Sequence, residues 1–154
     1  MRGFYVKIVV ALVVANVGFA VLGSCASRFN DDESGLREAV DSFSLAYFNW
    51  HFRDAVHYVD QESVAWLDYA ASQVNQEDVD SLKAMSNRAF VEVKDVKGSG
   101  SYRVATVEVC GFLSFDSIGR SPRIIDTATF QLPVKQVGES WKVVLRSLPR
   151  QVRM

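Results

Sequence analysis

Asp126 is the residue of this sequence that is best placed to do chemistry. It shares even-numbered spacing with the apolar residues Ile124, Ala128 and Phe130, so strand alternation puts its carboxylate on the buried face. A carboxylate in that position is costly unless it is paired or works as a general base. Such chemistry also needs an acid or an oxyanion donor. The nearest candidates are His57 and Tyr58, although no spacing places either of them opposite Asp126.

Other catalytic and metal-binding patterns are missing from the sequence. His51 and His57 do not have the spacing of a motif such as His-Glu-x-x-His, and a surface or bend position is the alternative for both. There is no Gly-rich phosphate loop, nucleophile elbow or zinc cluster. Cys110 has no neighbouring His or Lys that would activate its thiol, which favours an ordinary strand residue. We therefore expect no cofactor and no metal, and these observations favour a protein that is not an enzyme.

The N-terminal residues have the layout of an export signal. Arg2 and Lys7 precede an uncharged run from Ile8 to Leu22, and small residues follow. A segment of this kind enters the export machinery and is then removed. An uncleaved signal anchor is the alternative, because the uncharged stretch extends to Ser27 and about 20 apolar residues are enough to span a bilayer.

The end of that run, Leu22-Gly23-Ser24-Cys25, resembles the lipobox of bacterial lipoproteins. Gly23 departs from the Ala or Ser that is more usual at its position. The resemblance implies that the Cys25 thiol receives a diacylglycerol and that the chain is then cut before this cysteine. We therefore expect residues 1–24 to be a signal peptide and Cys25 to carry a palmitate-containing membrane anchor.

Residues 25–35 are polar and acidic without periodicity, which predicts a flexible tether between the lipid and the domain. In lipoproteins of the enteric type, an aspartate after the cysteine resembles an inner-membrane retention mark, and this chain has Ala26 there. The resemblance thus favours the outer membrane of a bacterial cell envelope. The cluster Asp31-Asp32-Glu33 is similar to the acidic tract that sends some Bacteroidetes lipoproteins to the cell surface, with a solvated linker as the alternative. The membrane face, periplasmic or surface, stays open.

The remaining sequence is long enough for a single domain, residues 36–150, followed by a short tail, residues 151–154. Loss of residues 1–24 leaves 15 of the 17 basic residues against 18 acidic ones. This acidic balance argues against a nucleic-acid partner held by phosphate contacts. Once Cys25 carries lipid, Cys110 has no cysteine to pair with, so no disulfide is expected.

Helical periodicity occupies the first half of the domain. Apolar residues recur at spacings of three or four from Leu36 to Tyr47, and the stripe moves to another side of the helix from Phe48. A single straight helix cannot bury both stripes against one sheet, so we expect a bend around residues 50–52. Asn75 with Asp78 has the spacing of a helix N-cap. The predicted helices are residues 35–49, 52–59, 63–74 and 76–88.

Beyond Phe90 the period switches to two, which predicts strands. The expected strands are residues 90–97, 102–115, 123–137 and 141–148. The turns between them fall at residues 98–100, 116–119 and 138–140. Trp141, Val143 and Leu145 form the inward set of the last strand, and Pro133 requires an edge or a bulge because it lacks a ladder donor. Helices followed by an antiparallel meander give an α+β fold in which the helices cover the apolar face of the sheet.

Two motifs carry a resemblance to a known family. Residues 48–55, Phe-Asn-Trp-His-Phe-Arg-Asp-Ala, are similar to the aromatic-x-x-Gly-Asp-x-x-Ala join of two helices, and residues 138–143 read Gly-Glu-Ser-Trp-Lys-Val. With the order of elements, they resemble the nuclear-transport-factor-two-like (cystatin-like, cone-shaped) superfamily over roughly residues 36–148. The resemblance implies N-terminal helices packed on a curved four-stranded antiparallel sheet, around a conical pocket. Ketosteroid isomerases and polyketide cyclases use that pocket for chemistry, whereas many exported members only bind.

Aromatic side chains crowd the predicted helices, and a cone lined by them would suit an apolar ligand or a partner's peptide. Core packing is the alternative. The set is Phe43, Tyr47, Phe48, Trp50, Phe52, Tyr58, Trp66 and Tyr69. We therefore expect a lipid-anchored cell-envelope protein that binds a ligand or another envelope protein. The alternatives are a small lyase or isomerase with Asp126 as general base, and a purely structural envelope subunit; the oligomeric state stays open.

Overall fold

A computed structural model describes residues 23–114 and 122–152 of the chain. The described residues from Gly35 onward form one compact unit. The predicted signal peptide falls mostly on residues 1–22, and the turn predicted at residues 116–119 falls on residues 115–121, so both predictions lie outside the described residues. The end of the predicted tail, residues 153–154, lies outside them too.

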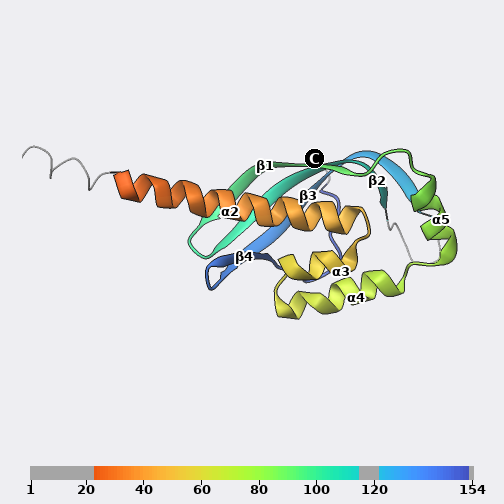
Figure 1. The fold of residues 1–154 in the computed structure, drawn as a ribbon, viewed down its shortest axis with the longest axis horizontal. Helices are drawn as coiled ribbons and strands as arrows, with labels where there is room; N and C mark the ends of the chain where they lie inside the picture. The colour runs from red at the N-terminus through yellow and green to blue at the C-terminus, as the bar shows by residue number, and fades with distance from the viewer. Residues whose placement is uncertain (1–22, 115–121, 153–154) are drawn as a thin grey trace, which may run out of the picture. The chain divides into compact units, whose positions relative to one another are not determined.

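The described part has the predicted α+β order, with all helices before all strands (Figure 1). The helical elements are α2 (Gly23–Phe48), α3 (Phe52–Ala55), η1 (Val56–Tyr58), η2 (Gln61–Ser63), α4 (Val64–Ser72) and α5 (Gln76–Ala84). The strands are β1 (Phe90–Ser99), β2 (Tyr102–Ser114), β3 (Arg123–Val137) and β4 (Ser140–Val143). They form one antiparallel sheet in the order β1-β2-β3-β4, which confirms the meander.

The core lies between α2 and one face of the sheet (Figure 1). Leu36, Val40 and Phe43 are fully buried at spacings of four and three, so one stripe of α2 faces the strands. Opposite them, β2 buries Ala105, Val107 and Val109 at a spacing of two. Trp141, Val143 and Leu145 are all buried, as predicted for the inward set of the last strand.

The helix boundaries correct two predictions. α2 begins at Gly23, so residues 25–35, predicted as a flexible tether, are helical. No Gly or Pro stands between Ala26 and Ser34, and a helix that is already nucleated by its packed residues extends readily through such a stretch. At the other end of the helical region, α5 stops at Ala84, four residues before the predicted end.

The last strand is shorter than predicted, ending at Val143 rather than at Leu148. The amide of Val144 donates to the carbonyl of Pro133, but Pro133 has no N–H to return the bond, so regular pairing stops there. The chain then leaves the sheet and comes back to it further along β3. There Gln151 forms a bridge with Phe130, and the amide of Val152 donates to the carbonyl of Thr129. Residues 151–152 therefore belong to the domain.

A local change of phase in β2 and β3 corrects the predicted face of Asp126. In β2 the buried residues are odd-numbered up to Val109. The next buried residue is Phe112, which is even-numbered, so the alternation changes phase between them. Between them Gly111 has a φ of 64°, a left-handed conformation that suits glycine. The pairs that flank this point are Cys110 with Thr127 and Phe112 with Ile125, so the sheet changes its inward face on both strands at the same level.

In β3 the consequence falls on Asp126 itself. The even-numbered residues Ala128 and Phe130 are buried as predicted, but Ile124 is 62% exposed and Asp126 is exposed as well. Ile125 takes the inward position instead and is half-buried. The prediction that Asp126 lies on the buried face is therefore wrong, because a regular alternation was extended across a point where the strand changes phase.

Candidate functional site

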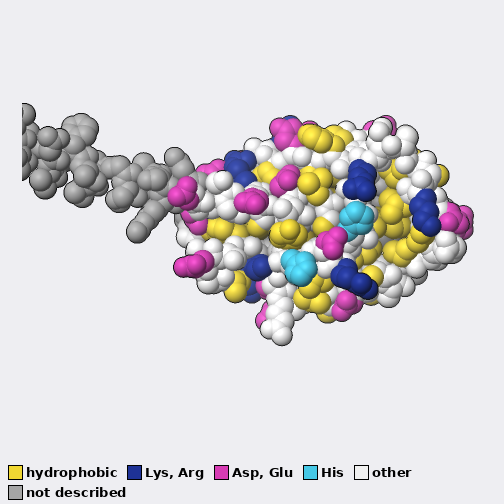
Figure 2. All heavy atoms as spheres, in the orientation of Figure 1, with side chains coloured by type: hydrophobic (Ala, Val, Ile, Leu, Met, Phe, Trp, Pro, Cys, Tyr) yellow, Lys and Arg dark blue, Asp and Glu magenta, His cyan; other side chains and the backbone are white. Residues whose placement is uncertain are grey.

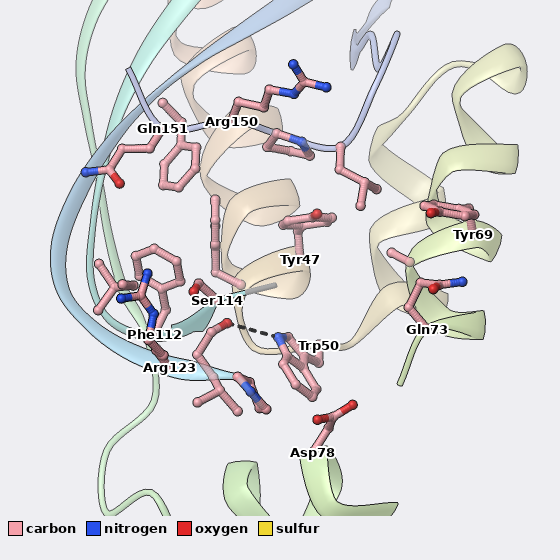
Figure 3. Close-up of a pocket in the computed structure, with 18 of the residues that line it drawn as sticks. Tyr47, Trp50, Tyr69, Gln73, Asp78, Phe112, Ser114, Arg123, Arg150 and Gln151 are labelled. Atoms are coloured by element: carbon pink, nitrogen blue, oxygen red, sulfur yellow. Dashed lines mark hydrogen bonds between the residues drawn. The ribbon is translucent and has the colours of Figure 1, made fainter. Parts of the chain in front are cut away.

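A cavity of about 840 Å³ lies between the sheet and the C-terminal half of the helical region (Figure 3). The end of α2, the helix α4 and the start of α5 supply its helical side. β2, β3 and residues 147–151 supply the rest, because the shortened β4 lets the C-terminal segment form part of the wall. A volume of this size is in the range of pockets that hold small organic ligands.

Aromatic rings make up much of the lining. They are Tyr47, Phe48, Trp50, Trp66, Tyr69, Phe112 and Phe130. The deeper rings pack on one another, with 4.6 Å between the ring centroids of Phe48 and Phe130 and 5.1 Å between those of Phe48 and Phe112. Five residues of the aromatic set singled out in the sequence thus line the cavity, whereas Phe43, Phe52 and Tyr58 pack in or against the core.

Trp50 reaches the cavity wall through an unfavourable backbone conformation. Its φ is 61°, at the position after α2 where glycine is usual. The amide of Trp50 donates to the Tyr47 carbonyl and that of His51 to the Ala46 carbonyl, which is a Schellman ending of the helix. A left-handed conformation costs a non-glycine residue about 1–3 kcal/mol. The indole N–H donates to the Leu113 carbonyl at 3.3 Å, which fixes the ring between α2 and β2.

Tyr47 presents a hydroxyl to the cavity from the last turns of α2 (Figure 3). Its side chain is 5% exposed, and within the described residues its hydroxyl has no hydrogen-bond partner. Burial raises the pKa of the Tyr47 hydroxyl far above its usual range, so the group stays protonated. The hydroxyl oxygen itself is not fully enclosed by the described residues, so a polar group of a molecule bound in the cavity can pair with it.

Asp78 brings a carboxylate to the same cavity from the first turn of α5. It is 6% exposed. Its Oδ2 accepts a hydrogen bond from the amide of Asn75 at 2.9 Å, and its own amide donates to Asn75 Oδ1 at 3.0 Å. This reciprocal pair confirms the predicted N-cap. The sequence shows the cap through its spacing, but it does not show that the carboxylate also lines a cavity.

The predicted catalytic residues do not come together at this cavity. Asp126 is exposed and is not among its lining residues. His57 is exposed and Tyr58 half-buried, and neither lines the cavity. Both histidine side chains of the chain lie at the surface (Figure 2). His51 borders a smaller hollow of about 360 Å³ with the end of α5 and the segment that follows it.

Replacing Asp126 by asparagine is expected to change the free energy of unfolding by less than about 0.5 kcal/mol, because the side chain is exposed. The measurement is denaturant unfolding of the full chain in detergent, followed by circular dichroism. Asp60→Asn is the matched comparison and should lower stability clearly, since it removes the charge of a buried carboxylate that pairs with Lys135. A loss above about 1 kcal/mol for Asp126→Asn would contradict the exposed position.

Asp60 belongs to a polar cluster that joins the helices to β3 and β4. The side chain is buried, and one of its oxygens lies 2.6 Å from Lys135 Nζ. Burial opposes ionisation most strongly, but hydrogen bonds and charge from Lys135 and Ser63 outweigh it and hold the pKa of Asp60 below its ordinary value. Ser63 Oγ in turn accepts from the amide of Leu145 at 2.7 Å. The buried carboxylate of Asp60 therefore has a structural role, because its contacts join the helical segment to β3.

Residues 23–114 and 122–152 contain no group of three His, Cys, Asp or Glu side chains arranged to hold a metal ion. In the same part of the chain, no helix has the length and apolar character that crossing a membrane requires.

The backbone at Cys25, the predicted lipidation site, lies in the first turn of α2. Cys110, the other cysteine, is a half-buried residue of β2 that has no disulfide partner in the described part of the chain. Comparisons of this chain with protein-family models, with curated proteins and with solved structures find no match.

Proposed function

We propose that this protein is a lipid-anchored component of the bacterial cell envelope whose α+β domain binds a small apolar ligand. The cavity carries this proposal: its volume of about 840 Å³ and the seven aromatic residues that line it in the described part of the chain suit a flat or branched apolar molecule. The lipobox-like sequence before Cys25 supports the envelope location and the membrane anchor.

The order of elements, with helices before a four-stranded meander, supports the nuclear-transport-factor-two-like family as part of the same proposal. A binding role is favoured over catalysis because Asp126, His57 and Tyr58 do not line the cavity. It is favoured over a purely structural role by Tyr47, a largely buried side chain whose hydroxyl has no partner in the described residues and is available at the cavity.

Binding of N-phenyl-1-naphthylamine, which is uncharged at neutral pH and fluoresces in apolar surroundings, tests the proposal. The full chain in detergent below its micellar concentration is expected to give a saturable rise in fluorescence. Tyr69→Ala should weaken this binding about fivefold, because it removes one ring from the wall. Tyr69 is 38% exposed, so the folded domain should tolerate its loss.

Tyr102→Ala is the matched control for that experiment. Tyr102 is 46% exposed and lies at the start of β2, away from the lining residues, so its removal should leave the probe affinity unchanged. Absence of a saturable signal with the wild-type chain, or an equal loss in the two variants, would rule out the cavity as the binding site.

A further inference from the structure

The distribution of charge around the cavity indicates which apolar ligands fit it. Among the described residues, four charged side chains line the cavity: Glu77, Asp78, Arg123 and Arg150. Glu77, Arg123 and Arg150 are exposed, so water and salt weaken their effect on a bound molecule. Asp78 is buried, and a charge in that position acts through a medium of lower dielectric constant. Of these four described charges, the one that a ligand inside the cavity experiences most strongly is therefore negative.

The capping role of Asp78 uses only part of its carboxylate. Oδ2 accepts the Asn75 amide, and the positive end of α5 favours an acid in this first turn. Within the described residues, no donor contacts Oδ1 and no basic side chain pairs with Asp78. A carboxylate has about four acceptor positions. Figure 3 shows the group pointing from α5 into the cavity, on the side where Trp50 lies.

The surrounding side chains suit a cation. Tyr47, Trp50, Trp66 and Tyr69 line the helical side of the cavity, and electron-rich rings attract ammonium groups, with tryptophan the strongest. Tyr47 is a second polar residue at this cavity: its side chain is more than nine-tenths buried, and its hydroxyl has no partner in the described residues. Its oxygen can accept a hydrogen bond from an ammonium N–H.

Resting on the proposed ligand-binding function, we infer that the cavity selects an apolar amine: a hydrophobic body held by the aromatic wall, with a protonated amino group on Asp78 Oδ1. The class is defined by this chemistry, an ammonium group attached to an aromatic or branched hydrocarbon. The ammonium completes the hydrogen bonding of the carboxylate, which is worth more inside a cavity than at an exposed site.

Three probes with the same hydrocarbon body test this inference by calorimetry on the full chain. They are 2-(1-naphthyl)ethylamine, 2-(1-naphthyl)ethanol and 3-(1-naphthyl)propanoate. The amine is expected to bind about tenfold more tightly than the alcohol, as a hydrogen bond between two charged groups predicts, and the carboxylate most weakly. An alcohol that binds as tightly as the amine, or a carboxylate that binds best, would overturn the inference.

Asp78→Asn tests the residue itself. The asparagine oxygen can still accept the Asn75 amide, so the cap is kept while the charge is lost. The variant should reduce the affinity for the amine about tenfold and leave that for the alcohol unchanged. Asp80→Asn makes the same change on an exposed residue of α5 outside the cavity and should alter neither affinity. Equal amine binding by Asp78→Asn and wild type would overturn the role of Asp78.

The two proposals fail in different ways. If N-phenyl-1-naphthylamine binds but the three probes show no preference for the amine, or none of them binds, the cavity remains a ligand site and the amine inference is wrong. If neither that dye nor any of the three probes binds, the proposed function fails and the inference fails with it. Thermal melts of each variant by circular dichroism confirm that the compared chains are folded.

Discussion

Cys25→Ala is expected to abolish the incorporation of labelled palmitate into this protein and to leave an unprocessed precursor in the cells that make it. The expectation rests on Leu22-Gly23-Ser24-Cys25 behind an uncharged run. The thiol is the group that would receive the diacylglycerol, so its loss removes the anchor completely. Anchoring by two or more acyl chains is far firmer than by one, so the variant should also move from the membrane fraction unless its signal segment holds it there.

Cys110→Ala is the control for this experiment. Cys110 is the only other cysteine of the chain, and it lies half-buried in β2, so its replacement should leave palmitate incorporation unchanged. Comparing the two variants distinguishes palmitate attached at Cys25 from an acyl group attached elsewhere on the protein. Wild-type chain that takes up no labelled palmitate would contradict the lipoprotein proposal and leave the cavity proposal untouched.

Local patterns were sufficient to predict much of the fold. Spacings of three and four place Leu36, Val40 and Phe43 on the buried stripe of α2, and the spacing of Asn75 and Asp78 predicts the capping box that begins α5. Each of these features depends on residues within one or two helical turns of each other, so all the interacting residues can be read from one short stretch of sequence. The antiparallel meander follows in the same way from short turns between alternating stretches.

Features that depend on two strands together were predicted less well. The alternation of Ala128 and Phe130 predicts that Asp126 lies on the buried face, but the sheet changes phase where Gly111 of β2 adopts a positive φ. Nothing within β3 itself marks that change. The end of β4 is similar: the missing N–H of Pro133 predicts an interruption of pairing, but its effect falls on Val144, just past the end of the neighbouring strand.

The candidate site lies beyond local patterns for the same reason. Tyr47, Tyr69 and Asp78 come from three helices, and the angles between those helices decide that all of them line one cavity. The sequence predicts the aromatic residues of the helices and the helix-capping carboxylate of Asp78 as separate features. It does not predict that the C-terminal segment returns to β3 and forms part of the wall.

Trp141→Ala is expected to lower the free energy of unfolding by about 3–5 kcal/mol, the usual cost of removing a large buried ring. Trp141 is 5% exposed in β4, and its strand pairs with the end of β3. The Arg103 guanidinium lies 4.9 Å from the centre of the indole, so the substitution also removes a cation–π contact worth about 0.5–1 kcal/mol. This is a large share of the stability of a small domain.

Trp66→Ala provides the matched comparison, because Trp66 is a half-buried residue at the wall of the cavity rather than a residue of the core. Its removal leaves a side of the cavity open to solvent instead of an enclosed void, so the loss of stability should be much smaller. Denaturant unfolding of the full chain in detergent, followed by far-ultraviolet circular dichroism, measures both. A loss below about 1 kcal/mol for Trp141→Ala would place this ring outside the core and contradict the register of β3 with β4.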